Sequence, residues 1–151
     1  MFAEKKPAEG WRDIKQNRGG IVDIEFLVQF LMLAFAAQHP DIVRRNTANA
    51  LRGCQQAGLL SAEEYAVLEE AYGFLRLLEN RLRLLHGKSE NRVSPNPAVR
   101  EQLRRLCDLP EGTDIVQRLD GHFQAVYAIV REYLEGSRPL LPSPSSSLGV
   151  G

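Results

Sequence analysis

Apolar residues recur along the chain at the three- and four-residue steps of α-helices, and no stretch of strand length alternates between apolar and polar positions. The spacing predicts helices at Val22 to Ala37, Thr47 to Ala57, Ser61 to Leu85, Asn96 to Cys107 and Asp114 to Glu135. The predicted fold class is therefore all-α: a bundle of about five helices with a long central hairpin-type helix, and no sheet.

The first predicted helix is apolar almost all round. Its main stripe, widened by further apolar residues, comprises Ile24, Leu27, Val28, Leu31 and Phe35, with Phe26, Phe30 and Leu33 beside them. Helices that are apolar on every side are usually buried, so we expect this one to be central. His39-Pro40 should end it, because proline cannot continue the helical hydrogen bonding.

Local signals mark the ends of the later helices. Ser61 followed three residues later by Glu64 predicts a capping box, in which each side chain satisfies a backbone amide. Gly58 predicts a left-handed end to the preceding helix. Asn96 followed by Pro97 is typical of an N-cap and a first helical position. These signals support the helix boundaries independently of the apolar spacing.

Composition divides the chain into three segments. Residues 1–17 are polar and are predicted to be an incoming linker, with Trp11 and Ile14 docking on the body. Residues 18–136 should form the helical bundle. Residues 137–151 are rich in proline and serine, and we expect a flexible tail there.

The overall composition is that of an ordinary soluble domain, with 44% hydrophobic and 25% charged residues. Nineteen basic residues balance nineteen acidic ones, which disfavours a nucleic-acid partner. The longest apolar run is too short and too interrupted to span a membrane, and no secretory signal is evident. Cys54 and Cys107 lack metal-binding spacing and are expected to be buried in a reducing compartment. We therefore expect a cytoplasmic protein.

The pair Gly19-Gly20 stands directly before the first predicted helix, with Lys15 and Arg18 upstream and Asp23 in the first turn. Exposed amides, a helix N-terminus and basic side chains are the ingredients of an anion site, which would allow nucleotide or phosphate contacts. The alternative is a hinge in which glycine supplies a positive φ. Asp23 in either case complements the positive end of the helix dipole.

Asp23 and Glu25 do not form a catalytic pair, because residues two apart on a helix point to different faces. Glu25 lies among apolar neighbours, and a buried carboxylate needs a cationic or hydrogen-bonding partner. If Glu25 pairs with a side chain of another helix, this pair should help to fix the relative position of two core helices.

The long helix offers several partners for that carboxylate. Arg76 and Glu79 are three residues apart, and Glu79 and Arg83 are four apart, which alone is typical of a solvated helix face. The other interpretation is a buried ion-pair cluster in which Arg76, Arg81 or Arg83 reaches Glu25.

No self-contained active site is evident in the sequence. The three histidines, His39, His86 and His122, lack ligand spacing to one another, and no serine lies in a nucleophile-elbow motif. We therefore predict no catalytic residue and no metal ligand.

Two segments of the chain resemble a known family. DIKQNRGGIVDIEFLVQ (residues 13–29) and AYGFLRLLENRLRLL (residues 71–85) are similar to signatures that follow a nucleotidyltransferase domain in bacterial glutamine synthetase adenylyltransferase, also called glutamate-ammonia-ligase adenylyltransferase. We call them the first and the second motif. The positions of the first motif that match the family are Lys15, Gly19, Gly20, Asp23, Glu25, Phe26 and Gln29. The order of helices to about residue 135 also resembles the family's helical domain.

The resemblance implies a parent enzyme of nitrogen metabolism with two similar halves. One half attaches AMP from ATP to a tyrosine of glutamine synthetase and the other removes it by phosphorolysis, under the control of glutamine and the PII signal protein. The form GGIVDIEF resembles the C-terminal half more. ATP and Mg²⁺ are implied for the parent, and glutamine synthetase, PII and the protein's own nucleotidyltransferase domain are the implied partners.

The sequence departs from the family in lacking the GSDxD motif whose carboxylates bind Mg²⁺. The resemblance therefore implies a scaffold or interaction domain that is inactive alone and holds no cofactor, with Gly19-Gly20 at the junction with the catalytic domain. Alternatives are a segment that supplies nucleotide contacts through the Gly-Gly loop, a generic helical adaptor, or the related module of PII uridylyltransferase.

Overall fold

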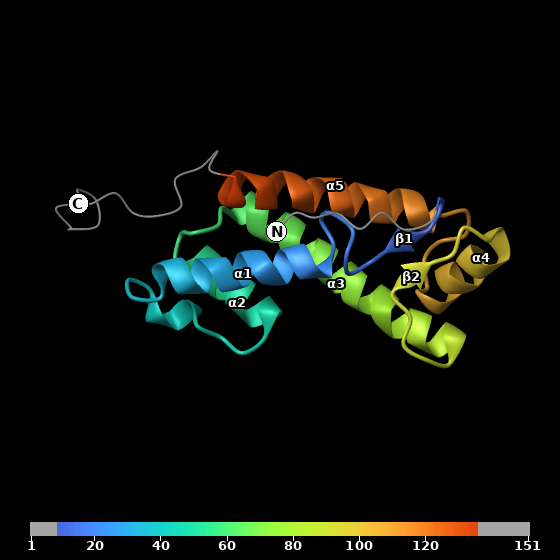
Figure 1. The fold of residues 1–151 in the computed structure, drawn as a ribbon, viewed down its shortest axis with the longest axis horizontal. Helices are drawn as coiled ribbons and strands as arrows, with labels where there is room; N and C mark the ends of the chain where they lie inside the picture. The colour runs from blue at the N-terminus through green and yellow to red at the C-terminus, as the bar shows by residue number, and fades with distance from the viewer. Residues whose placement is uncertain (1–8, 136–151) are drawn as a thin grey trace.

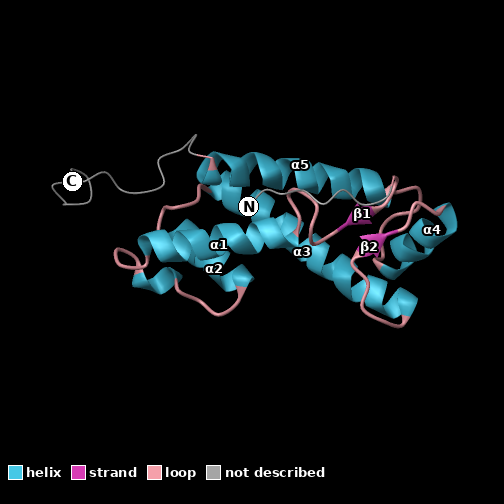
Figure 2. Cartoon of the chain, viewed as in Figure 1, coloured by secondary structure: helices cyan, strands magenta, loops and turns pink. Residues whose placement is uncertain are grey.

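Five α-helices carry most of residues 9–135, the part of the chain that the computed structural model describes (Figure 1). In chain order they are α1 (Ile21–Phe35), α2 (Thr47–Gln56), α3 (Ala62–His86), α4 (Pro97–Leu106) and α5 (Ile115–Leu134). A short 3₁₀ turn, Pro40–Ile42, follows α1 where His39-Pro40 was expected to end it. The prediction of an all-α bundle with one long helix is confirmed (Figure 2).

The helix ends follow the local signals. The Ser61 hydroxyl accepts a hydrogen bond from the Glu64 amide at 3.0 Å, and the Glu64 carboxylate accepts one from the Ser61 amide at 2.9 Å, so the capping box is present. Gly58 has φ +82 after α2. The Asn96 side chain accepts from the Ala98 amide at 2.8 Å, as expected for an N-cap.

The core lies where α1, α3 and α5 contact one another, and α2 and α4 pack against α3 on either side of that region (Figure 1). Its largest fully buried side chains are Ile14, Ile21, Ile24, Leu27, Leu31, Ile42, Leu51, Leu60, Leu68, Leu75, Leu78 and Leu82. Both cysteines are buried. Within residues 9–135, no helix is both long and apolar enough to cross a bilayer.

The absence of a sheet is a prediction that the structure corrects. β1 (Arg12–Asp13) pairs antiparallel with β2 (Arg92–Val93), with Arg12 opposite Val93 and Asp13 opposite Arg92. Two residues are too few to show an alternating pattern, so no sequence signal exists for this pair. Ile14 follows β1, and its buried side chain joins the core. The proposed linker and tail lie partly or wholly in residues 1–8 and 136–151, outside the described residues.

The prediction that α1 is the central helix is also wrong. Phe26 is 39% and Leu33 is 87% exposed, because no other described element covers the outer side of this helix. Its main stripe is buried as expected, with Ile24, Leu27 and Leu31 at 0% exposure. α1 therefore lies at the surface of the bundle, with one side packed in the core and the other side exposed.

Candidate functional site

The Gly-Gly loop joins β1 to α1 and packs directly on α5. Gly19 has φ +83, the positive value that the hinge interpretation requires. A Cβ atom at Gly19 would lie 2.0 Å from the backbone oxygen of Phe123 in α5. Glycine is therefore needed twice over at this position, for its backbone conformation and for the close approach of two backbones.

Gly20 is required for a different reason. Its φ of −81 suits any residue, and it is the N-cap of α1. A Cβ atom there would lie 2.7 Å from the carbonyl oxygen of Ile14 and 2.9 Å from those of Lys15 and Asn17. The loop thus wraps around Gly20. The close backbone approach that we expected at a domain junction occurs within this chain.

The amides at the start of α1 are occupied. Each of the four amides from residue 19 to residue 22 donates a hydrogen bond to an oxygen of the same chain. The pairs are Gly19 to Asp23 Oδ2 at 2.7 Å, Gly20 to Asn17 O at 2.8 Å, Ile21 to Ile14 O at 3.0 Å and Val22 to Lys15 O at 3.1 Å. An anion bound there would have to displace these oxygens, so the geometry disfavours the anion-site interpretation.

Asp23 acts as a cap for the loop. Its carboxylate accepts from the Gly19 amide and complements the N-terminal end of α1. Burial raises the pKa of Asp23 above its usual value, while the hydrogen bond from Gly19 and the charge of Arg18 act in the opposite direction. The Asp23 side chain therefore stabilises the Gly-Gly loop, which is a structural role.

Lys15 connects the first motif to the second. Its Nζ lies 3.0 Å from Oε2 of Glu79 on α3, and Arg76 Nη1 lies 2.9 Å from the other oxygen, Oε1. The Lys15 and Glu79 side chains are 34% and 18% exposed, so this ion pair is partly shielded from water. The expected pair of Arg76 and Glu79 is present, whereas Arg83 lies exposed on α3.

The structure corrects the partner expected for Glu25. This side chain is half-buried, and its Oε2 accepts a hydrogen bond from the Tyr72 hydroxyl of α3 at 3.4 Å. Arg76 lies over the Tyr72 ring at 5.8 Å, while Arg81 donates to the carbonyl oxygen of Leu106 at the end of α4. Because Glu25 keeps partial contact with water, a neutral hydroxyl suffices where a buried carboxylate would need a cation.

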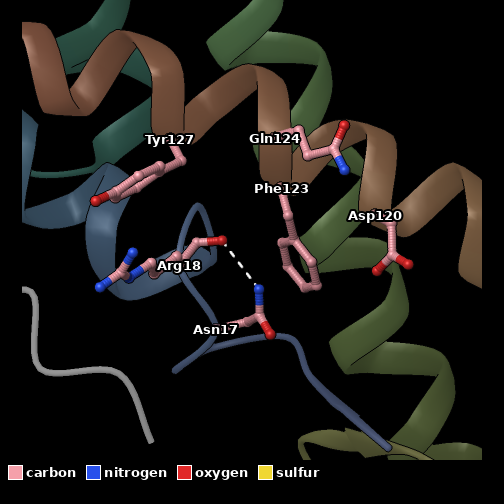
Figure 3. A pocket seen from close by; sticks show the side chains of 6 residues that line it. All are labelled: Asn17, Arg18, Asp120, Phe123, Gln124 and Tyr127. Atoms are coloured by element: carbon pink, nitrogen blue, oxygen red, sulfur yellow. Dashed lines mark hydrogen bonds between the residues drawn. The ribbon is translucent and has the colours of Figure 1, made fainter. Parts of the chain in front are cut away.

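Arg18 borders a shallow hollow against α5. Its guanidinium lies 5.2 Å from the centroid of the Tyr127 ring, a cation–π contact. Figure 3 shows the lining side chains, which enclose about 190 Å³ and come from the loop and from α5: Asn17, Arg18, Asp120, Phe123, Gln124 and Tyr127. The Asn17 side chain donates to the Arg18 carbonyl oxygen at 3.0 Å (Figure 3). The hollow is too small and open for a nucleotide.

Two arginines that the sequence analysis missed fasten the N-terminal segment. Arg12 binds Asp120 of α5 in a bidentate pair, with Nε to Oδ1 at 2.7 Å and Nη2 to Oδ2 at 3.0 Å. Arg100 of α4 donates to the carbonyl oxygens of Gly10 and Ser94 at 2.9 and 3.0 Å. Asp120 and Gly10 lie 108 and 90 residues from their arginines in the sequence, so no local pattern reveals these two contacts.

Few of the described side chains are arranged for catalysis or metal binding. Between residues 9 and 135 no group of three or more His, Cys, Asp or Glu side chains could hold a metal ion. Burial raises the pKa of the Cys54 thiol to about 11 and also raises that of Cys107, which keeps both thiols protonated. Burial lowers the pKa of His122, whose ring centroid lies 5.0 Å from that of Phe74, with the two rings tilted by 37°. The contacts of the Gly-Gly loop and the ion pair of Lys15 with Glu79 therefore support a structural role, in which the two motifs are joined.

A family model and several curated relatives match the chain. The model described as GlnD PII-uridylyltransferase matches residues 3–136. The relatives that we consider are all named bifunctional glutamine synthetase adenylyltransferase/adenylyl-removing enzyme.

The relative from Nitrosococcus oceani is 49% identical over 76 residues, which are 50% of this chain and 8% of that protein. The relative from Burkholderia mallei is 45% identical over 92 residues, 60% of this chain and 10% of that protein. The one from Xanthobacter autotrophicus is 36% identical over 138 residues, 89% of this chain and 13% of that protein. The chain thus corresponds to a small part of each relative.

Proposed function

The chain belongs to the family described as GlnD PII-uridylyltransferase, and on this premise we propose that it is a helical domain of a glutamine synthetase adenylyltransferase/adenylyl-removing enzyme. Its task is to act as a scaffold and interaction domain beside the nucleotidyltransferase domain. The names of the relatives support the identity of the parent, and the all-α fold supports the domain assignment.

One observation carries the scaffold role: the polar groups of the first motif around the Gly-Gly loop are used inside the chain. Lys15 is held by Glu79, the amides of residues 19–22 are bonded, Asp23 caps the loop and Arg18 stacks on Tyr127. A motif that bound ATP or Mg²⁺ would present such groups to a ligand. This one uses them to join the loop, α1, α3 and α5.

The activity belongs to the parent protein in this proposal. With ATP and Mg²⁺ the parent attaches AMP to a glutamine synthetase tyrosine and removes it again, in the bacterial cytoplasm and in response to glutamine and PII. The chain falls in the C-terminal half, on the form GGIVDIEF. Without a GSDxD motif this segment does not transfer AMP on its own.

A second candidate is the corresponding module of a PII uridylyltransferase, because the matching family model carries that name. The names of the curated relatives favour the adenylyltransferase. The two candidates differ in the protein that the parent modifies, so a binding comparison separates them.

Calorimetric titration with ATP and Mg²⁺ tests the scaffold role. We expect no saturable heat, because Lys15 and the loop amides are already bonded. Saturable binding that Lys15→Ala abolishes, and that the matched exposed-lysine variant Lys88→Ala retains, would show a nucleotide-contacting segment and overturn the scaffold proposal.

Titration of the same chain with glutamine synthetase, and in parallel with PII, tests the interaction role. We expect heat with glutamine synthetase. Binding of PII alone would favour the uridylyltransferase module. Binding of neither would reduce the segment to a spacer or a generic helical adaptor, and would place recognition in the nucleotidyltransferase domain.

A further inference from the structure

The segment that leads into the Gly-Gly loop changes its environment abruptly along its length. We call residues 10–13 the strap; it contains β1 and lies beside β2, near α4 (Figure 1). Each of its four residues is only half-buried, whereas Ile14, Gly19 and Gly20 of the loop that follows are buried. The boundary between the two environments lies directly after Asp13.

Polar contacts with three elements hold the strap in place. Arg12 forms the bidentate pair with Asp120 of α5, and the two side chains are 29% and 36% exposed. Arg100 of α4 donates to the Gly10 carbonyl oxygen at 2.9 Å. β1 and β2 have two residues each, and a strand pair that short is marginally stable by itself. Partly exposed polar contacts of this kind contribute little each.

Burial and close backbone contacts hold the loop that follows the strap. The Ile14 side chain is 0% exposed. Gly19 lies so close to α5 that a Cβ atom there would be 2.0 Å from the Phe123 backbone oxygen. The Ile21 amide donates to the Ile14 carbonyl oxygen at 3.0 Å. These three contacts involve no atom of the strap, so the loop keeps them when the strap detaches.

Asp13 lies at the hinge between the strap and the loop. Its Oδ1 accepts hydrogen bonds from the amides of Lys15 and Gln16, both at 2.9 Å. Its carbonyl oxygen accepts a hydrogen bond from the Asn17 amide at 3.1 Å. An aspartate that binds backbone amides two and three residues later stabilises a turn by itself. The residues before Asp13 can therefore rotate away while this turn remains.

We propose that the strap opens and closes as a unit: residues 10–13 detach from α4, α5 and β2 and pivot at Asp13 while the helical bundle stays folded. The Arg12–Asp120 pair is the main contact that keeps the strap closed, because it is both charged and bidentate. Local opening of this kind takes place in segments with few buried apolar contacts.

The state of the strap determines the direction in which the chain enters the bundle. In the closed state Gly10 packs on the loop before α4, where a Cβ atom would lie 3.0 Å from Cβ of Pro95. On the proposed function, on which this consequence rests, the residues before the strap lead to the nucleotidyltransferase domain. Opening would change the two domains of the parent from a fixed to a tethered arrangement.

Trp11 reports the state of the strap, because it is the single tryptophan of the chain and belongs to the strap. In the closed state Arg92 of β2 lies over the Trp11 ring, 5.0 Å from its centroid. Quenching of tryptophan fluorescence by acrylamide, which is uncharged, measures how accessible this ring is. Far-UV circular dichroism of the same samples measures the helix content of the bundle.

Arg12→Glu should open the strap, because it places two carboxylates where the Arg12–Asp120 pair stood. We expect Trp11 to become as accessible to acrylamide as in the urea-unfolded chain, with the helix content unchanged. Arg131→Glu is the matched control, because it reverses one charge of the surface pair with Glu135 at the other end of α5. It should leave the accessibility of Trp11 as it is in the unaltered chain.

Two results of that experiment would overturn the proposal. One is a loss of helix content in Arg12→Glu together with the exposure of Trp11, which would make residues 10–13 a fixed part of the fold. The other is equal quenching of Trp11 in Arg12→Glu and in the unaltered chain, which would mean that the pair with Asp120 does not keep the strap closed.

Amide hydrogen exchange tests the position of the hinge. Asp120→Asn keeps the size of the side chain and removes its charge, so it should accelerate exchange in residues 10–13 by about 3- to 10-fold. The amides of residues 19–22, which are bonded within the loop, should exchange as in the unaltered chain. Equal acceleration in both ranges would overturn the hinge at Asp13. These experiments need neither glutamine synthetase nor a nucleotide, so their outcome is independent of the proposed function.

Discussion

The inner and outer sides of α1 are both apolar, yet one is packed and the other is open. Leu27 on the inner side is 0% exposed, in a helix that packs against α3 and α5, while Leu33, six residues later, is 87% exposed. At its N-terminal end the helix is held still more tightly, by the Gly-Gly loop against α5. The difference teaches that an apolar side chain predicts a partner, but not that the partner lies in the same chain.

Gly19→Ala should break the packed side most severely. The added Cβ meets the Phe123 carbonyl oxygen at 2.0 Å in a backbone conformation of φ +83, so α5 or the loop must move. We expect a loss of more than about 4 kcal/mol in the free energy of unfolding, measured by urea denaturation. Gly58→Ala is the control, because Gly58 has φ +82 but open space around it. It should lose about 1 kcal/mol.

A truncation on each side of α1 compares the two faces directly. Leu27→Ala removes fully buried methyl groups and should lower the free energy of unfolding by about 2–5 kcal/mol. Leu33→Ala should change it by less than about 0.5 kcal/mol, because the Leu33 side chain is 87% exposed. Thermal unfolding of both variants at equal concentration measures the contrast. Similar losses would show that Leu33 is covered by another part of the chain.

The ion pair between the two motifs should contribute less. Lys15→Ala and Glu79→Gln, with the double variant, form a cycle whose coupling energy we expect to be roughly 0.5–1 kcal/mol, since the pair is partly exposed. The coupling should shrink in high salt, because ions screen partly exposed charges. A coupling of zero at low salt would mean that Lys15 does not tie the motifs together.

Asp23 gives the smallest expected effect, and it depends on pH. Burial raises the pKa of this carboxyl in the folded chain, so its contribution to stability is present below the unfolded value of about 3.9 and is lost as the pH rises through the folded value. Asp23→Asn keeps an oxygen for the Gly19 amide. It should match the unaltered chain in acid and be slightly more stable at neutral pH, as measured by urea denaturation between about pH 3 and pH 7. A deficit that is the same at every pH would contradict this account.

The helices could be predicted because their signals are local. Three- and four-residue spacing, the Ser61–Glu64 capping box and the Asn96–Pro97 start all act within one or two turns, and the structure has each of them. The same local reasoning offered a glycine hinge with a positive φ at Gly19-Gly20, and the structure shows it at Gly19. It could not identify Phe123 as the backbone that Gly19 touches, since the two are far apart in the sequence.

The candidate site shows the limit of that reasoning. The sequence offered Lys15 to an anion and an arginine of α3 to Glu25. The structure instead pairs Lys15 with Glu79, which keeps its expected partner Arg76, and Glu25 accepts from the Tyr72 hydroxyl. Charge and spacing predict that a pair forms. Which groups meet across two helices depends on the rotation of each helix, which spacing alone does not specify.

The sequence by itself determined the five helices, their ends, the buried stripe of α1 and the family resemblance, because each rests on residues that act locally or on a contiguous motif. Only the tertiary structure decided that the loop amides are already bonded, that β1 pairs with β2 and that no other element within residues 9–135 buries Val22, Phe26 and Leu33 of α1. The strand pair and the exposure of α1 depend on where segments distant in the chain meet or fail to meet. The loop amides bond to oxygens within residues 14–23, but the turn that brings them together has no simple pattern in the sequence.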